Sequence, residues 1–280
     1  MAPVRRLLTS IALASLVVAG AIAPVKAIAA EESTAATVLT INPAFLPLPS
    51  NWLRGELFAA PNVKVKVPYT NLPNAYFVHQ GSDVLNQLLH STPGRKIVLG
   101  HSEGAQVEDD WLRRYGPGSD IDPATVTFVL TGDPENKYGG CTTIPNSGCT
   151  AAYGGRGFPA DTRYTVKVLT RQYDFWADCP ADLSNSVALF NRVASNFVAG
   201  KGELRGPHLD YSNLSLTDPG NKSYVEGNAT YILGAPATYY LPMVTWRIES
   251  AENKRIHDLQ WRPMVESAYH RPMGTVDPPA

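Results

Sequence analysis

A serine between two glycines is the first place in this sequence where residue types and spacing could do chemistry. The apolar run "KIVL" ends in "GHSEG", which places Ser102 between Gly100 and Gly104. In enzymes that use this pattern, a strand ends in a sharp turn, a helix follows, and the turn exposes the serine hydroxyl as a nucleophile. Small residues are needed there because larger side chains would collide with the tight turn. A five-residue pattern can occur by chance, so it supports a nucleophilic serine only if the neighbouring segments form the strand and helix that it needs.

A serine nucleophile needs a general base, and the base needs an acid that orients it. With such a serine turn, the acid and then the histidine follow the serine along the chain. This order excludes the three histidines up to residue 101. Among the later ones, His208 lies in a loop, whereas His257 and His270 lie in or beside a predicted terminal helix. His208 is therefore the candidate base, and an ordinary surface histidine is the alternative.

A carboxylate follows a predicted strand at the required place in the order. The run "YTVKVL" at 164–169 leads into Asp174, and Asp178 comes four residues later. Asp174 is the candidate acid because it directly follows a strand end, and Asp178 is kept as the alternative. A turn or helix cap would be the purely structural use of either residue.

The elements that must position these residues alternate between strand and helix patterns. Because strands that alternate with helices favour a parallel sheet covered on both faces, we predict an α/β fold with a central, mostly parallel sheet flanked by helices. The predicted strands are 37–41, 63–67, 96–99, 125–130 and 164–169, and the predicted helices are 75–90, 106–115, 182–198 and 250–272.

The first thirty residues have a different character from the rest. Arg5 and Arg6 precede an apolar run, and Ala27 and Ala29 provide a small-x-small exit, so residues 1–30 are predicted to be a signal peptide. An uncleaved membrane anchor is the alternative. The remaining residues, 31–280, are predicted to form one domain that is secreted or associated with the cell envelope. Because no basic cluster is present, nucleic acid is not expected as a partner.

The cysteines leave several pairings open. Cys141 and Cys149 bracket a loop that a disulfide could close, and Cys179 could pair with either of them, which leaves one thiol over. No CxxC or HxxxH spacing is present, so no metal site is predicted.

Longer blocks carry a family resemblance. The stretches "GHSEG", "RQYDFWADCP", "HLDYSNLSLTDPGNKSYVEGNATYILG" and "WRPMVESAY" resemble the PE-PPE domain of mycobacteria and their relatives, a cutinase-like group of serine hydrolases with the α/β-hydrolase fold. The resemblance covers about residues 36–272. It implies that Ser102 is the nucleophile, Asp174 the orienting acid and His208 the general base. No metal or organic cofactor is implied. Because a signal-like segment replaces the usual PE or PPE segment, partners that recognise those segments are not implied.

The oxyanion hole is predicted from two backbone N–H groups. One belongs to Glu103, the residue after the nucleophile. The other should come from the loop after the first strand, where the family tends to have glycines and this chain has "NPAFLP". Because Pro43 has no N–H, Ala44 or Phe45 is the candidate donor.

These observations lead to three functional hypotheses. The first is a serine esterase or lipase that acts on short to medium acyl chains. The second is an acyltransferase that moves acyl groups between envelope glycolipids such as acylated trehalose. The third is a non-catalytic envelope-binding protein, for which the altered 42–46 loop is the support. The expected partners are an ester or glycolipid substrate and, peripherally, envelope lipids.

Overall fold

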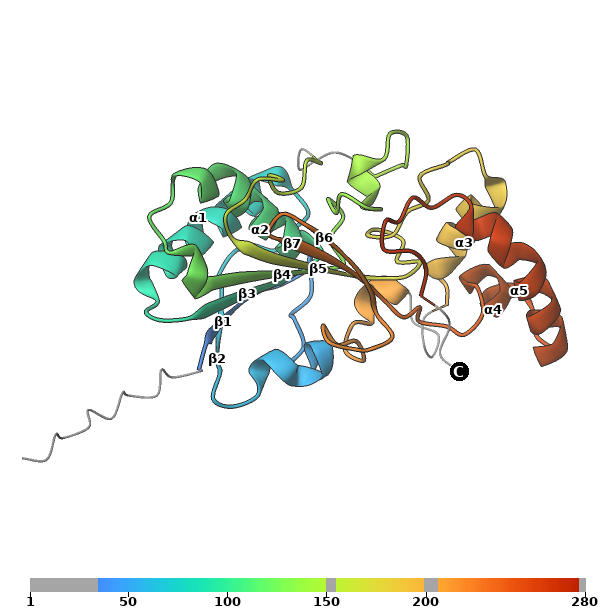
Figure 1. The fold of residues 1–280 in the computed structure, drawn as a ribbon, viewed down its shortest axis with the longest axis horizontal. Helices are drawn as coiled ribbons and strands as arrows, with labels where there is room; N and C mark the ends of the chain where they lie inside the picture. The colour runs from blue at the N-terminus through green and yellow to red at the C-terminus, as the bar shows by residue number, and fades with distance from the viewer. Residues whose placement is uncertain (1–34, 150–154, 199–205, 277–280) are drawn as a thin grey trace, which may run out of the picture. The chain divides into compact units, whose positions relative to one another are not determined.

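The computed structural model of the chain describes residues 35–149, 155–198 and 206–276 (Figure 1). Internal contacts group residues 34–280 into one compact unit. The signal peptide predicted at 1–30 lies outside the described residues. No helix in the described part of the chain has the length and apolar character needed to cross a membrane.

The centre of this unit is a seven-stranded sheet with the order β2-β1-β3-β4-β5-β7-β6. All neighbouring strands are parallel except β6 and β7, which form an antiparallel hairpin, so the predicted mostly parallel sheet is confirmed. The strands are β1 (Thr37–Ile41), β2 (Val63–Lys66), β3 (Lys96–His101), β4 (Val126–Thr131), β5 (Thr165–Arg171), β6 (Lys222–Glu226) and β7 (Ala229–Gly234).

Burial along the strands follows their place in the sheet. Every residue of β3 is buried, which fits the continuous apolar run of a central parallel strand. At one edge, β2 has the alternating sequence "VKVK" and is mostly exposed. At the other edge, the antiparallel β6 is also mostly exposed. Ser102 and Asp174 therefore follow central strands, whose positions are fixed by neighbours on both sides, whereas His208 lies in the loop before β6.

One face of the sheet is covered by α1 (Ala75–Ser91) and α2 (Glu103–Arg114). Asn74, just before α1, is its N-cap: the Asn74 side chain accepts a hydrogen bond from the Tyr76 N–H. In the core under these helices, Trp111 stacks on Phe128, and Tyr164 meets both rings edge-on. This aromatic cluster fixes the position of α2, the helix that follows Ser102.

The other face carries no long α-helix among the described residues. It is covered by the 3₁₀ segment Trp52–Phe58 and by the loop around Tyr211 and Leu214. Pro43, Pro47 and Pro49 prevent a helix from running through residues 43–49. The segment after them is interrupted by positive φ angles at Leu53, Arg54 and Gly55. The expected cover is present on both faces, but on this face it is irregular chain.

The remaining helices pack together near the carboxyl ends of the strands (Figure 1). They are α3 (Ser186–Ser195), α4 (Pro242–Arg247) and α5 (Ala251–Glu266). The predicted helices 182–198 and 250–272 correspond to α3 and α5, but both predicted ranges are longer than the observed helices. The hairpin β6–β7 and the short helix α4 were not predicted.

The disulfide alternatives are resolved in favour of the short loop. Cys141 and Cys149 are bonded, and Cys179 is a buried free thiol. Burial raises the pKa of the Cys179 thiol to about 12, which keeps it protonated and unreactive at neutral pH.

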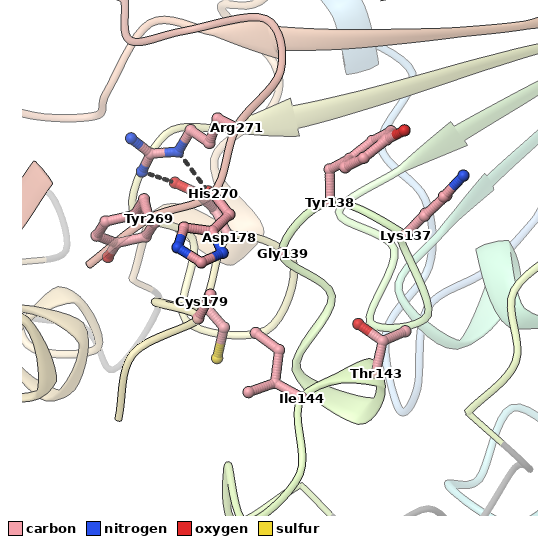
Figure 2. A pocket seen from close by; sticks show the side chains of 11 residues that line it. Lys137, Tyr138, Gly139, Thr143, Ile144, Asp178, Cys179, Tyr269, His270 and Arg271 are labelled. Carbon is pink, nitrogen blue, oxygen red and sulfur yellow. Dashed lines mark hydrogen bonds and ion pairs between the residues drawn. The ribbon is translucent and has the colours of Figure 1, made fainter. Parts of the chain in front are cut away.

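The segment after α5 clamps the loop that follows β5. The guanidinium of Arg271 donates to both carboxylate oxygens of Asp178, at 2.9 and 2.5 Å (Figure 2). The N–H of Val276 donates to the Gln172 side chain at 2.7 Å. Asp178 and Arg271 also line a pocket of about 270 Å³. The loop from Gln172 to Asp178 is thus held by residues about a hundred positions further along the chain.

The helix α2 buries several carboxyl groups together with those of the loop after β4. The carboxyl oxygens of Glu108 and Asp109 accept no hydrogen bond from an amide, guanidinium or alcohol group of the described residues. Burial raises the pKa of both groups well above the ordinary range, and the negative charge of Asp133 adds to the effect. Burial, followed by the charge of Glu135, raises the pKa of Asp133 to about 7. The nearby charged partner is Arg113, which is bound to Glu135. The fold therefore retains protons on buried acids at neutral pH.

We expect this protein to lose stability as the pH rises. Above pH ~4 the unfolded chain releases carboxyl protons that the folded chain keeps, so the free energy of unfolding falls until the folded-state pKa is passed. Asp109→Asn removes the ionisable group and should raise Tm at pH 8 by about 3 °C or more, with a smaller change at pH 5. Thermal melts across this pH range measure the effect. Asp120→Asn, at an exposed carboxylate, is the matched control, and equal shifts in both variants would contradict the prediction.

Candidate active site

Ser102 occupies a strained turn between β3 and α2. Its backbone φ is 55° and its ψ is −117°, a conformation that non-glycine residues rarely adopt. The Ser102 N–H donates to the carbonyl of Thr131 on β4 at 3.0 Å, and the Ser102 carbonyl accepts from Ala105 and Gln106 in α2. The strain is therefore held by hydrogen bonds to both the sheet and the helix.

The two glycines around Ser102 permit a close approach of backbones. A Cβ on Gly100 would overlap the Gly104 carbonyl group, and a Cβ on Gly104 would lie 2.5 Å from the carbonyl oxygen of Ile41. The start of α2 therefore rests directly on the ends of β3 and β1. Any larger residue at either position would push the helix off the sheet and displace Ser102.

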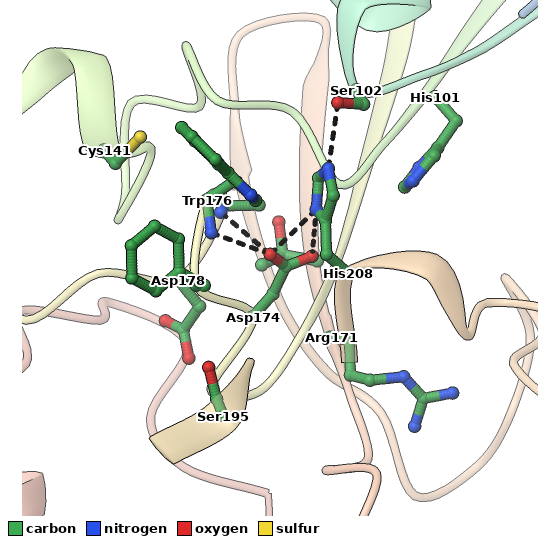
Figure 3. Close-up of polar contacts among 12 residues, drawn as sticks. His101, Ser102, Cys141, Arg171, Asp174, Trp176, Asp178, Ser195 and His208 are labelled. Carbon is green, nitrogen blue, oxygen red and sulfur yellow. Dashed lines mark hydrogen bonds and ion pairs between the residues drawn. The ribbon is translucent and has the colours of Figure 1, made fainter. Parts of the chain in front are cut away.

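Ser102, His208 and Asp174 form a continuous chain of hydrogen bonds (Figure 3). The Nε2 atom of His208 lies 2.9 Å from the Ser102 hydroxyl oxygen. The Nδ1 atom of His208 lies 2.9 Å from each carboxylate oxygen of Asp174. The three residues come from the ends of β3 and β5 and from the loop before β6, so chain segments far apart in the sequence meet here.

Asp174 is completely buried and has hydrogen-bond donors around it. Besides His208, it accepts from the backbone N–H of Trp176 at 2.9 Å, the N–H of Ala177 at 3.2 Å and the Tyr211 hydroxyl at 2.7 Å. Burial raises the pKa of Asp174, but the charge of His208 and these hydrogen bonds outweigh burial and hold the pKa below its ordinary value. The carboxyl group is therefore ionised at neutral pH and can stabilise a protonated imidazole.

Asp178, the alternative acid, lies on the far side of the same turn. Its carboxylate accepts from Arg271 and from the Tyr173 N–H, at 2.6 Å in the latter case. These contacts give it a structural use, because they fix the turn that carries Asp174. The geometry thus brings Asp174, and not Asp178, to His208.

Three residues around the His208 ring were not singled out from the sequence: His101, Tyr211 and Gly132. His101 lies with its ring centroid 4.8 Å from that of His208, and Tyr211 lies 5.1 Å from His101. Burial, together with the charge of His208, lowers the pKa of His101 to about 3. His101 is therefore uncharged at neutral pH and packs against the His208 ring. A Cβ on Gly132 would overlap the His101 ring. His101 and Tyr211 do occur in the quoted "GHSEG" and "HLDY" blocks, but only the fold shows their contacts.

The oxyanion candidates differ in what their N–H groups do. Glu103 is the first residue of α2, so its N–H has no partner within the helix. The Phe45 N–H donates to the Asn71 carbonyl at 2.8 Å, so the suggestion that Phe45 could be a donor is corrected. Ala44 remains the candidate for the second donor. The Asn71 side chain donates to the carbonyl groups of Pro43 and Leu46, which holds the loop around Ala44.

The Glu103 side chain is buried behind this backbone group. Its carboxyl oxygens have no hydrogen-bond partner among the described residues, and burial raises its pKa to about 7. Within residues 35–149, 155–198 and 206–276, no three His, Cys, Asp or Glu side chains are grouped so that they could hold a metal ion. The chemistry that this arrangement supports is nucleophilic attack by Ser102 assisted by His208.

Comparisons with known proteins place the chain in a family. The model of a family described as the PE-PPE domain matches residues 58–270. The SL1278 acyltransferase Chp1 of Mycobacterium tuberculosis is 26% identical over 72% of this chain and 50% of its own length. The esterase PE16 of the same organism is 28% identical over 45% of this chain and 26% of its own length. This chain thus spans half or less of these relatives. A cutinase-like protein from Cryptococcus sp. is 16% identical, with a TM-score of 0.40 over 53% of this chain and 81% of its own.

The two acids should respond differently to loss of charge. Asp174→Asn keeps the shape but removes the charge opposite His208, so kcat on p-nitrophenyl butyrate should fall by about 10³–10⁴-fold. Asp178→Asn weakens a buried ion pair and should instead lower the free energy of unfolding by about 3 kcal/mol, with kcat per folded molecule changed less than about 10-fold. Esterase assays and denaturant titrations measure the two effects. A greater loss of kcat in folded Asp178→Asn would reverse the assignment.

Proposed function

Because this chain belongs to the PE-PPE domain family, we propose that it is a serine esterase that hydrolyses carboxylic esters of short to medium acyl chains. The observation that carries the proposal is the hydrogen-bond chain from Ser102 through His208 to the ionised Asp174, with both links at 2.9 Å. A buried carboxylate, an imidazole and a hydroxyl on a strained turn have this arrangement in acyl transfer.

In the first half-reaction, the Ser102 oxygen bonds to the ester carbonyl carbon, and its proton passes to His208 Nε2. Asp174 stabilises the resulting imidazolium through Nδ1. The negative oxygen of the tetrahedral intermediate accepts from the N–H groups of Glu103 and Ala44. The bond to the alcohol oxygen then breaks, this oxygen takes the proton from Nε2, and an acyl-enzyme remains on Ser102.

In the second half-reaction, another hydroxyl group attacks the acyl-enzyme. His208 takes the proton of the attacking hydroxyl, and the acyl group leaves Ser102 with the proton returned to the serine. If water attacks, the product is a free acid. No cofactor takes part in either half of this proposed reaction.

An acyltransferase is the second candidate, and one observation favours it. The relative that matches the largest part of this chain among those described above is named an acyltransferase. In that case the attacking hydroxyl belongs to a sugar, and the acyl group passes between envelope glycolipids such as acylated trehalose. Both candidates share the first half-reaction, so the residues named above serve either one.

The surroundings of the site support peripheral contact with envelope lipids. Phe45 and Tyr76 are 69% and 67% exposed, and Leu72 and Trp176 are also exposed. Residues 42–53 and 67–78 contain no charged side chain, although 18% of the whole chain is charged. Exposed aromatic and aliphatic groups without neighbouring charges suit an uncharged lipid surface.

We also propose that the protein acts outside the cytoplasm. The signal-like sequence at 1–30 supports this location, and so does the Cys141–Cys149 disulfide, because such bonds persist in oxidising compartments.

A transfer assay tests the proposal and separates its alternatives. The full chain is incubated with p-nitrophenyl butyrate, and separately with an acylated trehalose donor plus free trehalose. We expect free acid as the main product and a loss of about 10⁶-fold in kcat for Ser102→Ala. Acylated acceptor as the main product would favour the acyltransferase.

The matched control is Ser82→Ala, which removes a buried hydroxyl from α1 away from the site. This variant should keep wild-type kcat. If the wild type and Ser102→Ala are equally inert in both assays, the catalytic proposal fails and the non-catalytic envelope-binding hypothesis replaces it.

Lipid contact is tested with the double variant Leu72→Ser, Tyr76→Ser. It should reduce binding to phosphatidylcholine vesicles about 10-fold or more, because two apolar side chains are lost, while hydrolysis of soluble p-nitrophenyl acetate stays unchanged. Co-sedimentation measures binding. Val225→Ser, at an equally exposed apolar residue on β6, is the control. Equal binding by the double variant and the wild type would remove these residues from the contact surface.

A further inference from the structure

We infer that Tyr211 is a positioning residue of this site, which acts through Asp174. The inference rests on the proposed roles of Ser102, His208 and Asp174. Tyr211 follows His208 by three residues and comes two residues after the end of the short 3₁₀ turn Pro207–Leu209, and its side chain is completely buried. One turn of chain therefore provides both the base and a group that binds the acid.

The proton of the Tyr211 hydroxyl has a defined direction. The hydroxyl oxygen lies 2.9 Å from the backbone N of Arg171 and 2.7 Å from Asp174 Oδ2. A backbone N–H can only donate, so the hydroxyl accepts from Arg171. Its own proton is then free for Asp174, whose ionised carboxylate can only accept. Tyr211 is thus a hydrogen-bond donor to the acid.

This donor completes the set of bonds around the carboxylate. Oδ1 of Asp174 accepts from the N–H groups of Trp176 and Ala177, and Oδ2 accepts from Tyr211, while His208 approaches both oxygens. A carboxylate has about four lone-pair sites, so each side is occupied. Without Tyr211, Oδ2 would have only the imidazole, and the Arg171 N–H would lose its acceptor inside the protein.

The Tyr211 ring is itself firmly placed. It stacks on Trp52 with the centroids 5.6 Å apart and the planes 15° apart. The buried Arg171 guanidinium donates to the carbonyl groups of Asp210 and Ala235, which ties the turn to the end of β5. The phenol therefore joins three separately built parts: the β5 end, the Asp174 loop and the His208 turn.

Tyr211→Phe isolates the hydroxyl, because it retains the ring and its stacking. We expect kcat on p-nitrophenyl butyrate to fall about 10-fold, with KM changed less than about twofold, since substrate does not touch Tyr211. The acid limb of the kcat/KM profile should move to higher pH. This direction follows because Asp174, with one donor fewer, keeps more negative charge on its own oxygens. The stronger attraction to the imidazolium favours the protonated, inactive form of His208.

The matched control is Tyr164→Phe. Tyr164 is equally buried on the sheet side of α2, and its hydroxyl donates to the Ile121 carbonyl at 3.2 Å, remote from Asp174. Loss of this hydroxyl should lower Tm, as in Tyr211→Phe, but leave kcat and the acid limb where they are. A purely structural role for Tyr211 predicts the same result for both variants.

A second substitution protects the test against poor folding of Tyr211→Phe. Replacement of Tyr211 by 3-fluorotyrosine keeps the hydroxyl and makes it a stronger donor, so the acid limb should move to lower pH, opposite to the phenylalanine variant.

The outcomes separate this inference from the proposed function. If Ser102→Ala is inactive but both Tyr211 variants have the wild-type kcat and acid limb, the inference is wrong and the proposed function stands. If Ser102→Ala is as active as the wild type, the proposed function itself fails.

Discussion

The position of Ser102 depends on the contact between the backbones of β3, α2 and β1. Gly100 and Gly104 allow the first turn of α2 to touch the two strand ends, with no side chain between them. That contact forces Ser102 into a strained conformation, and hydrogen bonds from β4 and α2 hold it there. The same contact places the first N–H of the helix beside the serine hydroxyl. The strain is therefore maintained by the sheet and is not a property of the five-residue motif alone.

Chain order and strand patterns pointed to Ser102 and Asp174, and the resemblance to the PE-PPE domain did most to favour His208 over an ordinary surface histidine. The buried runs at β3, β4 and β5 are strongly apolar, so both their type and their neighbours could be inferred. Because parallel strands place their carboxyl ends at one edge, Ser102, Asp174 and His208 could be expected to converge. The sequence favoured Asp174, which lies nearer the strand end, but it left Asp178 open as the alternative because both residues follow the same strand. The choice between them depends on Arg271, a residue far along the chain that binds Asp178.

The parts that were missed depend on contacts rather than on local pattern. The cover formed by Trp52–Phe58 has no helical periodicity. It packs in one cluster with strand residues and with Tyr211 and Leu214, which lie about 160 positions further along the chain. The hairpin β6–β7 is mostly exposed on one strand, which weakens the apolar signal. His101 reads as an ordinary residue of the serine motif until its ring is seen against His208. Phe45 was named as a donor because sequence does not show that Asn71 already accepts from its N–H.

The clamp on the loop after β5 has a consequence for the order in which this protein matures. Arg271 and Val276 hold the loop that carries Asp174, so this loop has its final bonds only after those residues have been synthesised. While the chain is being synthesised, Asp178 and Gln172 lack these two contacts until its last part has been made. The loop that carries Asp174 is therefore the part of the sheet edge that is completed last, by residues that belong to the final stretch of the described chain.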